Sequence, residues 1–374
     1  MRLLCGRRGR GTWQWLRPMV GRFPAGRGRL AFSRRLACPE PTRPRALTLR
    51  VGSLVVALVA VLCGCARSGR LGEYQAARSL HLAPDGRLIV TDLGSGASDG
   101  AVVAVDTASG RRATLLGGLP STRGSGQGHA DLAGPSGADM AADGTVCVVI
   151  GDAPAKPTAG FGTLRCNSGL VVDLKAFQAR RRLPSNPYDV VWDGQAGWFV
   201  SDGAANNVLH VDRAGRVVLV ASFPSLKAAG LSQRDGQGVP TGLARGPDRT
   251  LYTALYGGAP FDGPPAAVVA FAPSTGNGPT DARPRLVASV PHPIAVAATP
   301  QGVVVVDYGG APGVRGRGEV RLVVGAGAGA VAGPGGVVAS GLDRPTGVAW
   351  LPDGRLVIAE SDRRGLRVLR PDRY

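Results

Sequence analysis

Short apolar runs separated by a recurring turn set the pattern of this chain. Each of six turns ends one apolar run and begins the next: Asp85-Gly86, Asp143-Gly144, Asp193-Gly194, Asp248-Arg249, Gln301-Gly302 and Asp353-Gly354. Successive turns lie 50 to 58 residues apart, by subtraction of their positions. A β-rich unit of this length cannot bury both faces of its own sheet, and such a period is typical of propeller blades. The pattern therefore predicts an all-β fold, a six-bladed β-propeller over residues 75–374.

Each repeat contains the pattern of four short strands. The third repeat is the most compact, with strand-like segments at residues 189–192, 198–202, 207–212 and 216–222. In the sixth repeat only three such segments are present, at residues 347–351, 355–360 and 366–370. A missing fourth strand would leave an open sheet edge. We therefore expect residues 70–77 to supply it, so that the two ends of the propeller meet in one blade.

The two faces of such a ring differ in their loops. In a four-stranded meander, the six recurring turns share one face, which we name the turn face. The opposite face, named the loop face, carries the longest connections, at residues 121–137, 151–162, 224–238, 256–265 and 309–318. Loops on a rigid scaffold are where binding residues concentrate. The sequence therefore predicts any binding site at the loop face, around the mouth of the central channel.

Positive charge is concentrated near the N-terminus. The formal net charge is +18, and residues 1–50 hold thirteen Arg and one acid, Glu40. This segment carries +12, which leaves +6 for the rest of the chain. Without a clustered basic face and interleaved aromatic residues, a nucleic-acid partner is not expected. Residues 1–50 show no apolar period and are expected to be a disordered basic leader. An unusually long leader and a translation start assigned too far upstream are the two open interpretations.

An uncharged segment, residues 51–65, follows the leader. Its apolar run at residues 51–62 ends in Cys63-Gly64-Cys65. The run is shorter than the roughly 20 residues that span a bilayer and fits the apolar core of a secretory signal. The Gly64-Cys65 pair is similar to a bacterial lipobox with Cys65 as the lipidated residue. We predict a lipoprotein signal, a linker at residues 66–74, and an extracytoplasmic protein held at the membrane by lipid. The alternatives are a secreted protein and a signal anchor.

Cys147 and Cys166 lie in neighbouring predicted strands of the second repeat. If residue 151 pairs with residue 162 in an antiparallel ladder, Cys147 falls opposite Cys166. Directly opposed residues on antiparallel strands can meet the geometry of a disulfide. The sequence predicts this disulfide, with two buried free thiols as the alternative.

Several loop motifs support a family resemblance. They include Gly118-Leu119-Pro120-Ser121, Gly134-Pro135-Ser136, Phe161-Gly162-Thr163-Leu164, Ser185-Asn186-Pro187-Tyr188, Val239-Pro240-Thr241-Gly242-Leu243 and Gly258-Ala259-Pro260-Phe261. In these motifs, over about residues 75–374, the chain resembles the ScyD/ScyE family of secreted NHL-like propellers. The resemblance implies an extracytoplasmic β-propeller, and it offers no catalytic residue set that could be transferred to this chain. Two departures are the low-complexity stretch at residues 325–336 and Leu255, which stands where an acid is usual.

Acidic residues recur where the second strand of a repeat ends. Asp92, Asp202 and Glu360 hold this position, and Asp152 and Asp307 lie within two residues of it. Acids around one channel mouth can bind a cation or a cationic ligand, with raised pKa values. Alternatively, each carboxylate accepts backbone N–H bonds in its own loop. Recurrence favours this structural role, because a site usually breaks the symmetry of its repeats.

The sharpest local motif is Ser185-Asn186-Pro187-Tyr188-Asp189, which is either a structural entry turn or part of a ligand pocket. Tyr188 can reach the channel, since Pro187 fixes the backbone before it. His129 and His292 are interpreted as surface histidines of loops. No catalytic residue is predicted. The candidate binding residues are Asn186, Tyr188, Asp189, Asp202, Asp92, Glu360 and Asp307.

Two functions from different classes follow from these features. The first is a binding or scaffold module whose partner at the loop face is a small molecule, a cell-wall component or a protein. The second is a metal-dependent propeller hydrolase or lyase acting on a small ester, lactone or sugar, with oxygen ligands such as Asn186, Asn206, Asp189 and Glu360. No spacing marks those four as a set, so the sequence favours a monomeric binding module over an enzyme. No cofactor is predicted. Binding of a divalent cation is an open alternative, and no residues are assigned as its ligands.

Overall fold

The computed structural model describes residues 69–124, 132–152, 159–232, 235–258, 266–273, 284–310, 317–325, 335–361 and 363–370. The chain divides between Cys65 and Ala66 into two units, and every described residue belongs to the second. The predicted leader, the signal segment with Cys65, and His129 lie outside the described residues. Within the described part, no helix is long and apolar enough to cross a membrane.

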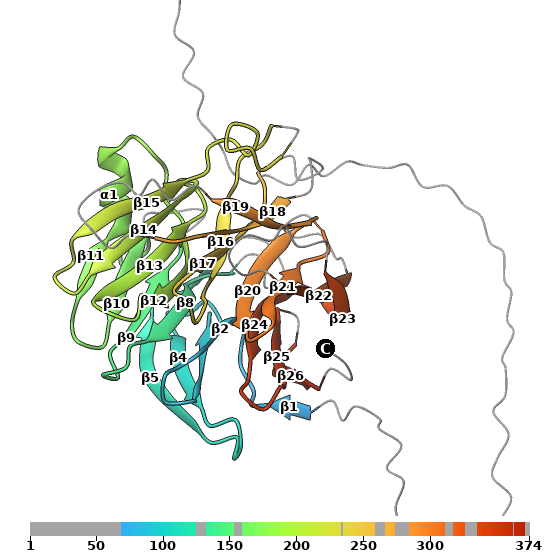
Figure 1. Ribbon diagram of the computed structural model, residues 1–374. Helices are drawn as coiled ribbons and strands as arrows, with labels where there is room; N and C mark the ends of the chain where they lie inside the picture. The colour runs from blue at the N-terminus through green and yellow to red at the C-terminus, as the bar shows by residue number, and fades with distance from the viewer. Residues whose placement is uncertain are drawn as a thin grey trace, which may run out of the picture. The chain divides into compact units, whose positions relative to one another are not determined.

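Six four-stranded antiparallel sheets form a six-bladed β-propeller (Figure 1), which confirms the predicted fold class. Blade 1 contains β2 (Ala77–Leu82), β3 (Leu88–Asp92), β4 (Gly100–Val105) and β5 (Arg112–Leu119). Blade 2 contains β8 (Pro135–Met140), β9 (Val146–Ile150), β10 (Thr163–Cys166) and β11 (Val171–Asp173). Blade 3 contains β12 (Pro187–Trp192), β13 (Gly197–Asp202), β14 (Asn207–Asp212) and β15 (Val217–Ser222).

The second half of the ring has the same order. Blade 4 contains β16 (Pro240–Arg245), β17 (Leu251–Leu255), β18 (Ala266–Phe271) and β19 (Arg285–Val290). Blade 5 contains β20 (Pro293–Thr299), β21 (Gly302–Asp307), β22 (Arg317–Val324) and β23 (Gly336–Asp343). Blade 6 contains β24 (Pro345–Trp350), β25 (Leu356–Glu360), β26 (Leu366–Leu369) and β1 (Gly69–Leu71). A short pair, β6 (Thr122–Arg123) with β7 (Leu132–Ala133), lies between blades 1 and 2.

Strand β1 closes the ring. It pairs antiparallel with β26, from Gly69 opposite Val368 to Leu71 opposite Leu366, and Figure 1 shows the two side by side. The fourth strand of blade 6 therefore comes from the N-terminal side of the propeller, as predicted, although it is shorter than residues 70–77. This pairing covers the edge of β26 that would otherwise be open.

The hydrophobic core consists of six main clusters, each between two neighbouring blades. One joins Leu164 of blade 2 to Trp198 of blade 3. The cluster that closes the ring joins Leu88 of blade 1 to Val357 of blade 6. Because each sheet buries its apolar side chains against the next sheet, no blade has a separate core, and the repeats stabilise one another.

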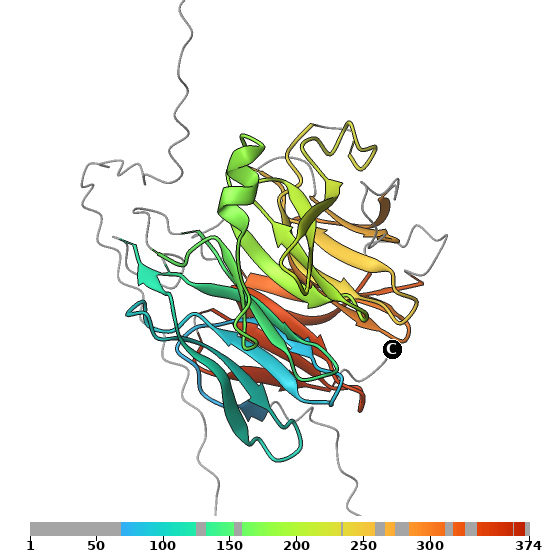
Figure 2. The same cartoon turned by 90° about the vertical axis from the view of Figure 1, so that its left-hand side faces the viewer.

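One element was not predicted from the sequence. Helix α1 (Leu174–Arg180) connects blade 2 to blade 3 and stands at one end of their strands (Figure 2). Asp173 caps it by accepting the N–H of Ala176 at 2.7 Å, and Leu174 and Gln178 are buried. Seven residues are too few to show a helical apolar period, which explains why the pattern of strands and turns concealed it.

The register of β9 and β10 places Cys147 opposite Cys166, and a disulfide joins them. Ile150 lies opposite Thr163 in the same ladder. In a regular antiparallel ladder the two residue numbers of every pair have the same sum. The observed pairs therefore have the register that was predicted from the pairing of residue 151 with residue 162.

Candidate functional site

The first strands of the six blades, β2, β8, β12, β16, β20 and β24, lie around the central channel, and each contacts the first strand on either side. Five begin with proline, which has no N–H to donate and therefore suits an edge paired on one side only. In every blade, the pairing between the first and the second strand also shifts in register near the start of the first strand, which marks a β-bulge. Such bulges re-aim the side chains that follow the first residue.

Small and large residues alternate around the ring at the second and third positions of the first strands. Blades 2, 4 and 6 carry the small pairs Ser136-Gly137, Thr241-Gly242 and Thr346-Gly347. Blades 1, 3 and 5 carry the larger pairs Arg78-Ser79, Tyr188-Asp189 and Ile294-Ala295. The glycines allow the following blade to approach closely: a methyl group at Gly137 would overlap Oδ1 of Asp189 and lie 2.6 Å from its Cα. At Gly242 it would lie 2.5 Å from Cα of Ala295.

The hydroxyl groups of the small pairs link neighbouring blades. Ser136 Oγ donates to the carbonyl oxygen of Pro187 at 3.0 Å. Thr346 Oγ1 donates to the carbonyl oxygen of Ala77 at 3.4 Å, across the closure of the ring. Thr241 Oγ1 makes the corresponding contact with blade 5. These bonds satisfy carbonyl oxygens at the inner edges of the blades, where no further strand can pair.

The large side chains fill the channel toward the loop face. The guanidinium carbon of Arg78 lies 4.8 Å from the centre of the Tyr188 ring. Ile294 belongs to a buried cluster against which Tyr188 packs. Only about 10 Å³ of free space lies beside Tyr188 and Ile294, room for about one water molecule. Burial raises the pKa of Tyr188, whose hydroxyl has no hydrogen-bond partner in the described part of the chain.

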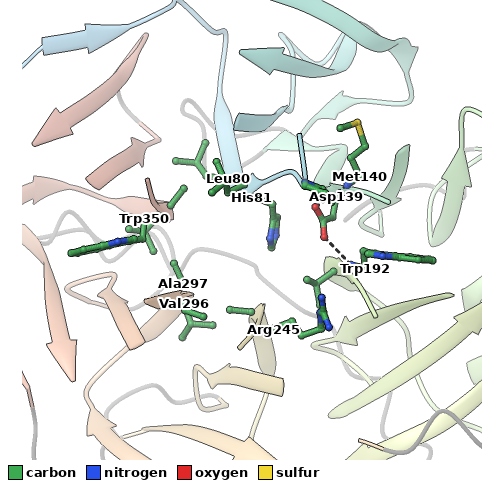
Figure 3. A pocket seen from close by; sticks show the side chains of 16 residues that line it. Leu80, His81, Asp139, Met140, Trp192, Arg245, Val296, Ala297 and Trp350 are labelled. Atoms are coloured by element: carbon green, nitrogen blue, oxygen red, sulfur yellow. Dashed lines mark hydrogen bonds between the residues drawn. The ribbon is translucent and has the colours of Figure 1, made fainter. Parts of the chain in front are cut away.

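A cavity of about 260 Å³ opens at the other end of the channel, at the turn face (Figure 3). Its walls are the last residues of the first strands, together with Pro84 of the first turn. The fifth position supplies His81 and Asp139 in blades 1 and 2 but only Val191, Ala244, Ala297 and Ala349 in the others. The cavity is therefore polar on one side and apolar on the other. In Figure 3 the rings of Trp192 and Trp350 point away from its centre.

His81 and Asp189 form an ion pair that spans blades 1 and 3. His81 Nε2 donates to Asp189 Oδ1 at 3.0 Å, and the side chains are 11% and 5% exposed. Burial alone disfavours an imidazolium, but the negative charge of Asp189 and the hydrogen bond to it raise the pKa of His81 to about 9. The other carboxylate oxygen of Asp189 accepts the N–H of Leu243 at 2.9 Å. His81 is therefore cationic at neutral pH and held in place.

Asp139 is the second acid beside His81. Its oxygens accept the N–H groups of Met140 and Trp192, each at 2.8 Å, so the carboxylate also links blade 2 to blade 3. Burial raises the pKa of Asp139, while the positive charge of His81 acts in the opposite direction. The Trp192 contact is the dashed line in Figure 3.

Arg245 completes the polar side of the cavity. Its guanidinium lies close to Gly194 of the first turn of blade 3, where an added methyl group would be 2.5–2.7 Å from Nη1, Cζ and Nη2. Within the described residues no carboxylate pairs with it and no acceptor bonds it. An always-charged group with five donors thus lines the cavity without an internal acceptor.

The predicted acids of the loop face are engaged in their own loops. Asp92 accepts the N–H groups of Gln75, Ala76 and Gly94 at 2.7–3.1 Å. Asp202 accepts the Ser185 hydroxyl at 2.6 Å and the N–H groups of Asn186 and Ala205 at 2.7 and 3.1 Å. Burial raises the pKa of Asp202, although these bonds act in the opposite direction. Both carboxylates join the loop that enters the first strand to the loop after the second.

Glu360 and Asp307 hold the equivalent positions in blades 6 and 5. Glu360 accepts the N–H of Asp343 at 2.8 Å and pairs with Arg367 at 2.9 Å. Asp307 accepts the N–H of Gly309 at 2.9 Å, and burial raises its pKa. Asp152, also near this position, pairs with Lys175 at 2.8 Å. These contacts are of the structural kind that recurrence favours.

A metal site would require oxygen ligands that converge. Asn186 Oδ1 accepts the N–H of Asp152, and Asn206 Oδ1 accepts that of Val239, at 2.9 and 3.0 Å. Asp189 and Glu360 are occupied as described above. In the described ranges, no group of three or more His, Cys, Asp or Glu side chains is placed to hold a metal ion. The four residues named as possible metal ligands thus accept hydrogen bonds within the protein, and we derive no step through a metal.

Of the seven binding candidates from the sequence, Tyr188 and Asp189 lie beside the channel. Sequence reasoning missed His81, Asp139 and Arg245, which line the cavity. It placed the site at the loop face, whereas the side chains of Arg78, Tyr188 and Ile294 fill that half of the channel. A usable signal was present: His81 and Asp139 are charged residues in first strands that are otherwise apolar at the fifth position.

Comparison with known proteins identifies structural similarity only. No protein-family model matches the sequence, and a search of curated proteins gives no significant match. A proposed oxidoreductase (glucose dehydrogenase) from Thermus thermophilus has a TM-score of 0.50 and 16% identity, over 81% of this chain and 100% of that one. A gluconolactonase from Xanthomonas campestris has a TM-score of 0.49 and 16% identity, over 82% and 90% of the two chains.

The calcium-binding protein regucalcin from Agrobacterium tumefaciens has a TM-score of 0.48 and 10% identity, over 80% of this chain and 92% of that one. At such identities the similarity concerns the fold. The chemistry of this chain therefore has to be argued from its own residues.

Proposed function

We propose that this protein is an extracytoplasmic β-propeller that binds a small ligand in its channel and is held at the membrane by a lipid on Cys65. The observation that carries the binding function is the turn-face cavity. It is concave, partly apolar, and lined by a few oriented polar groups, which are the usual properties of small-molecule sites. The rigid ring keeps His81, Asp139 and Arg245 in fixed positions.

The disulfide supports an extracytoplasmic location. Cys147 and Cys166 are bonded within blade 2, and structural disulfides persist in oxidising compartments. The apolar run that ends at Gly64-Cys65 supports export and lipidation. The resemblance to ScyD/ScyE-type propellers in the loop motifs agrees with this location.

We further propose that the chain acts as a monomer. Its ring is closed within one chain by the pairing of β1 with β26 and by the core between blades 1 and 6. No second copy is needed to cover a sheet edge there. The loop face remains the surface proposed for a cell-wall component or a protein partner.

Anchoring is tested by metabolic labelling with a fatty-acid analogue in a bacterial host. Wild type and Cys63→Ser should be labelled, whereas Cys65→Ser should not, because of the two cysteines that end the apolar run only Cys65 follows a small residue. Labelling of Cys65→Ser, or no labelling of wild type, would overturn the lipid anchor.

Ligand binding is tested by a fragment screen with ligand-observed NMR. Ala297 lines the cavity, so Ala297→Phe, or the smaller Ala297→Leu, should abolish binding of the fragments that wild type binds. Ala214→Phe places the same ring on an exposed turn and should leave binding unchanged. Fragments that bind all these proteins equally would show that the cavity is not the site.

A further inference from the structure

The turn-face cavity contains a surplus of hydrogen-bond donors. Arg245 has no acceptor or ion-pair partner among the residues that the structure describes, and its guanidinium lies close to Gly194. His81 uses Nε2 for Asp189, and its Nδ1 has no partner in the described ranges. Figure 3 shows His81, Asp139 and Arg245 along one side of the opening. The acceptor oxygens of Asp139 and Asp189 are already bonded to backbone N–H groups.

The opposite side of the cavity is apolar and small. Ala244, Ala297 and Ala349 hold the fifth position in three blades, and Val296 and Val348 precede two of them. None of these side chains can accept a hydrogen bond from a ligand. A ligand that satisfies both sides therefore needs an acceptor-rich end and a compact apolar body.

We infer that the turn-face cavity binds a small organic acid, whose carboxylate contacts Arg245 and His81 and whose apolar body lies against the alanines of blades 4 to 6. This inference rests on the proposed function and adds the chemical class of the ligand. Planar guanidinium and carboxylate groups match in two parallel hydrogen bonds, which are among the strongest in proteins. His81, with its pKa raised to about 9, contributes a second positive charge at neutral pH.

Asp139 determines the orientation of the ligand. Its carboxylate repels a second carboxylate, so the charged end of the ligand lies toward Arg245 and not toward blade 2. The volume of about 260 Å³ restricts the ligand to a compact molecule. Benzoate and isobutyrate are suitable probes, and benzamide and isobutyramide have the same shapes without the charge.

The test is isothermal titration calorimetry of the full chain with these four probes and with inorganic phosphate. The acids should bind at least about tenfold more tightly than the matching amides, since a charge-assisted hydrogen bond is worth about tenfold or more in affinity. Arg245→Gln and His81→Gln should each weaken acid binding by a similar factor and weaken amide binding less, because the neutral amide forms no charge-assisted bond. Arg111→Gln, an exposed arginine of blade 1, is the matched control and should have no effect. Thermal unfolding of each variant verifies that it is folded.

The inference would be overturned by equal binding of acids and amides, by unchanged acid binding in folded Arg245→Gln, or by phosphate binding as tight as benzoate binding. Failure of all four organic probes would also reject it. These outcomes differ from failure of the proposed function. Neutral fragments that bind wild type and are lost in Ala297→Phe would keep the cavity as the ligand site and reject only the organic acid.

Discussion

Alkaline pH should destabilise the propeller by an amount that depends on His81. The folded state holds the imidazolium beside Asp189 with a pKa of about 9, against 6.5 for an ordinary histidine. Below pH 6.5 the ring is protonated in both the folded and the unfolded states, and the stabilisation is fully present. Between pH 6.5 and 9 the unfolded state loses its proton first, so the free energy of unfolding falls. Above pH 9 the contribution is gone.

The magnitude follows from the difference between these two pKa values, 9 and 6.5, which corresponds to about 3 kcal/mol. Solvent should screen the interaction between His81 and Asp189 only weakly, because the His81 side chain is only 11% exposed. Since three of the five tryptophans lie in the described core or at the channel, their fluorescence can report unfolding. Urea titrations between pH 6 and 9.5, with the disulfide intact, give the free energy at each pH.

His81→Gln removes the titrating group and keeps a side chain of similar polarity. The wild type should lose about 3 kcal/mol more than this variant between pH 6 and 9.5. Other titrating groups are common to both proteins and cancel in the difference. Asp189→Asn should flatten the curve in the same way, because it removes the partner charge. Parallel curves for wild type and His81→Gln would refute a protonated His81 in the folded state.

Three further predictions concern the ring itself, each measured by urea unfolding. Gly137→Ala should lower the free energy of unfolding by about 2 kcal/mol or more, because the added methyl group overpacks against Asp189. The control Gly336→Ala should have little effect, because no atom lies within 4 Å of the added methyl group. Equal effects of the two substitutions would contradict the close approach of blades 2 and 3. Replacing Cys147 and Cys166 by Ser should cost about 3 kcal/mol, because the disulfide closes a loop with a sequence separation of 19; an unchanged midpoint would mean that the thiols are free. Thr346→Val should cost about 1 kcal/mol by removing the bond to Ala77, and a neutral result would show that the bond does not hold the ring closed.

The fold was accessible from the sequence because its signal repeats. Turns such as Asp143-Gly144 and Asp193-Gly194 mark the same point in each blade, and six approximate copies reinforce one another. The register of Cys147 and Cys166 followed from the spacing of two adjacent strands. Helix α1 breaks the repeat, and its seven residues were not recognisable.

The cavity was less accessible because it depends on contacts between distant repeats. His81 and Asp189 are 108 residues apart, and their bond exists only because Gly137 of the intervening blade leaves room for the carboxylate. The alternation of small and large pairs, such as Thr241-Gly242 and Ile294-Ala295, decides which half of the channel is filled. Acids such as Asp92 recur visibly in the sequence, yet their carboxylates serve their own loops.

The most direct measurement is a crystal structure of the protein grown with benzoate. Our account predicts a six-bladed ring with the ligand in the turn-face cavity, its carboxylate on Arg245 and beside His81, and its ring against Ala297 and Ala349. A ligand bound only at the loop face, or a turn-face cavity filled by the protein's own side chains, would contradict it.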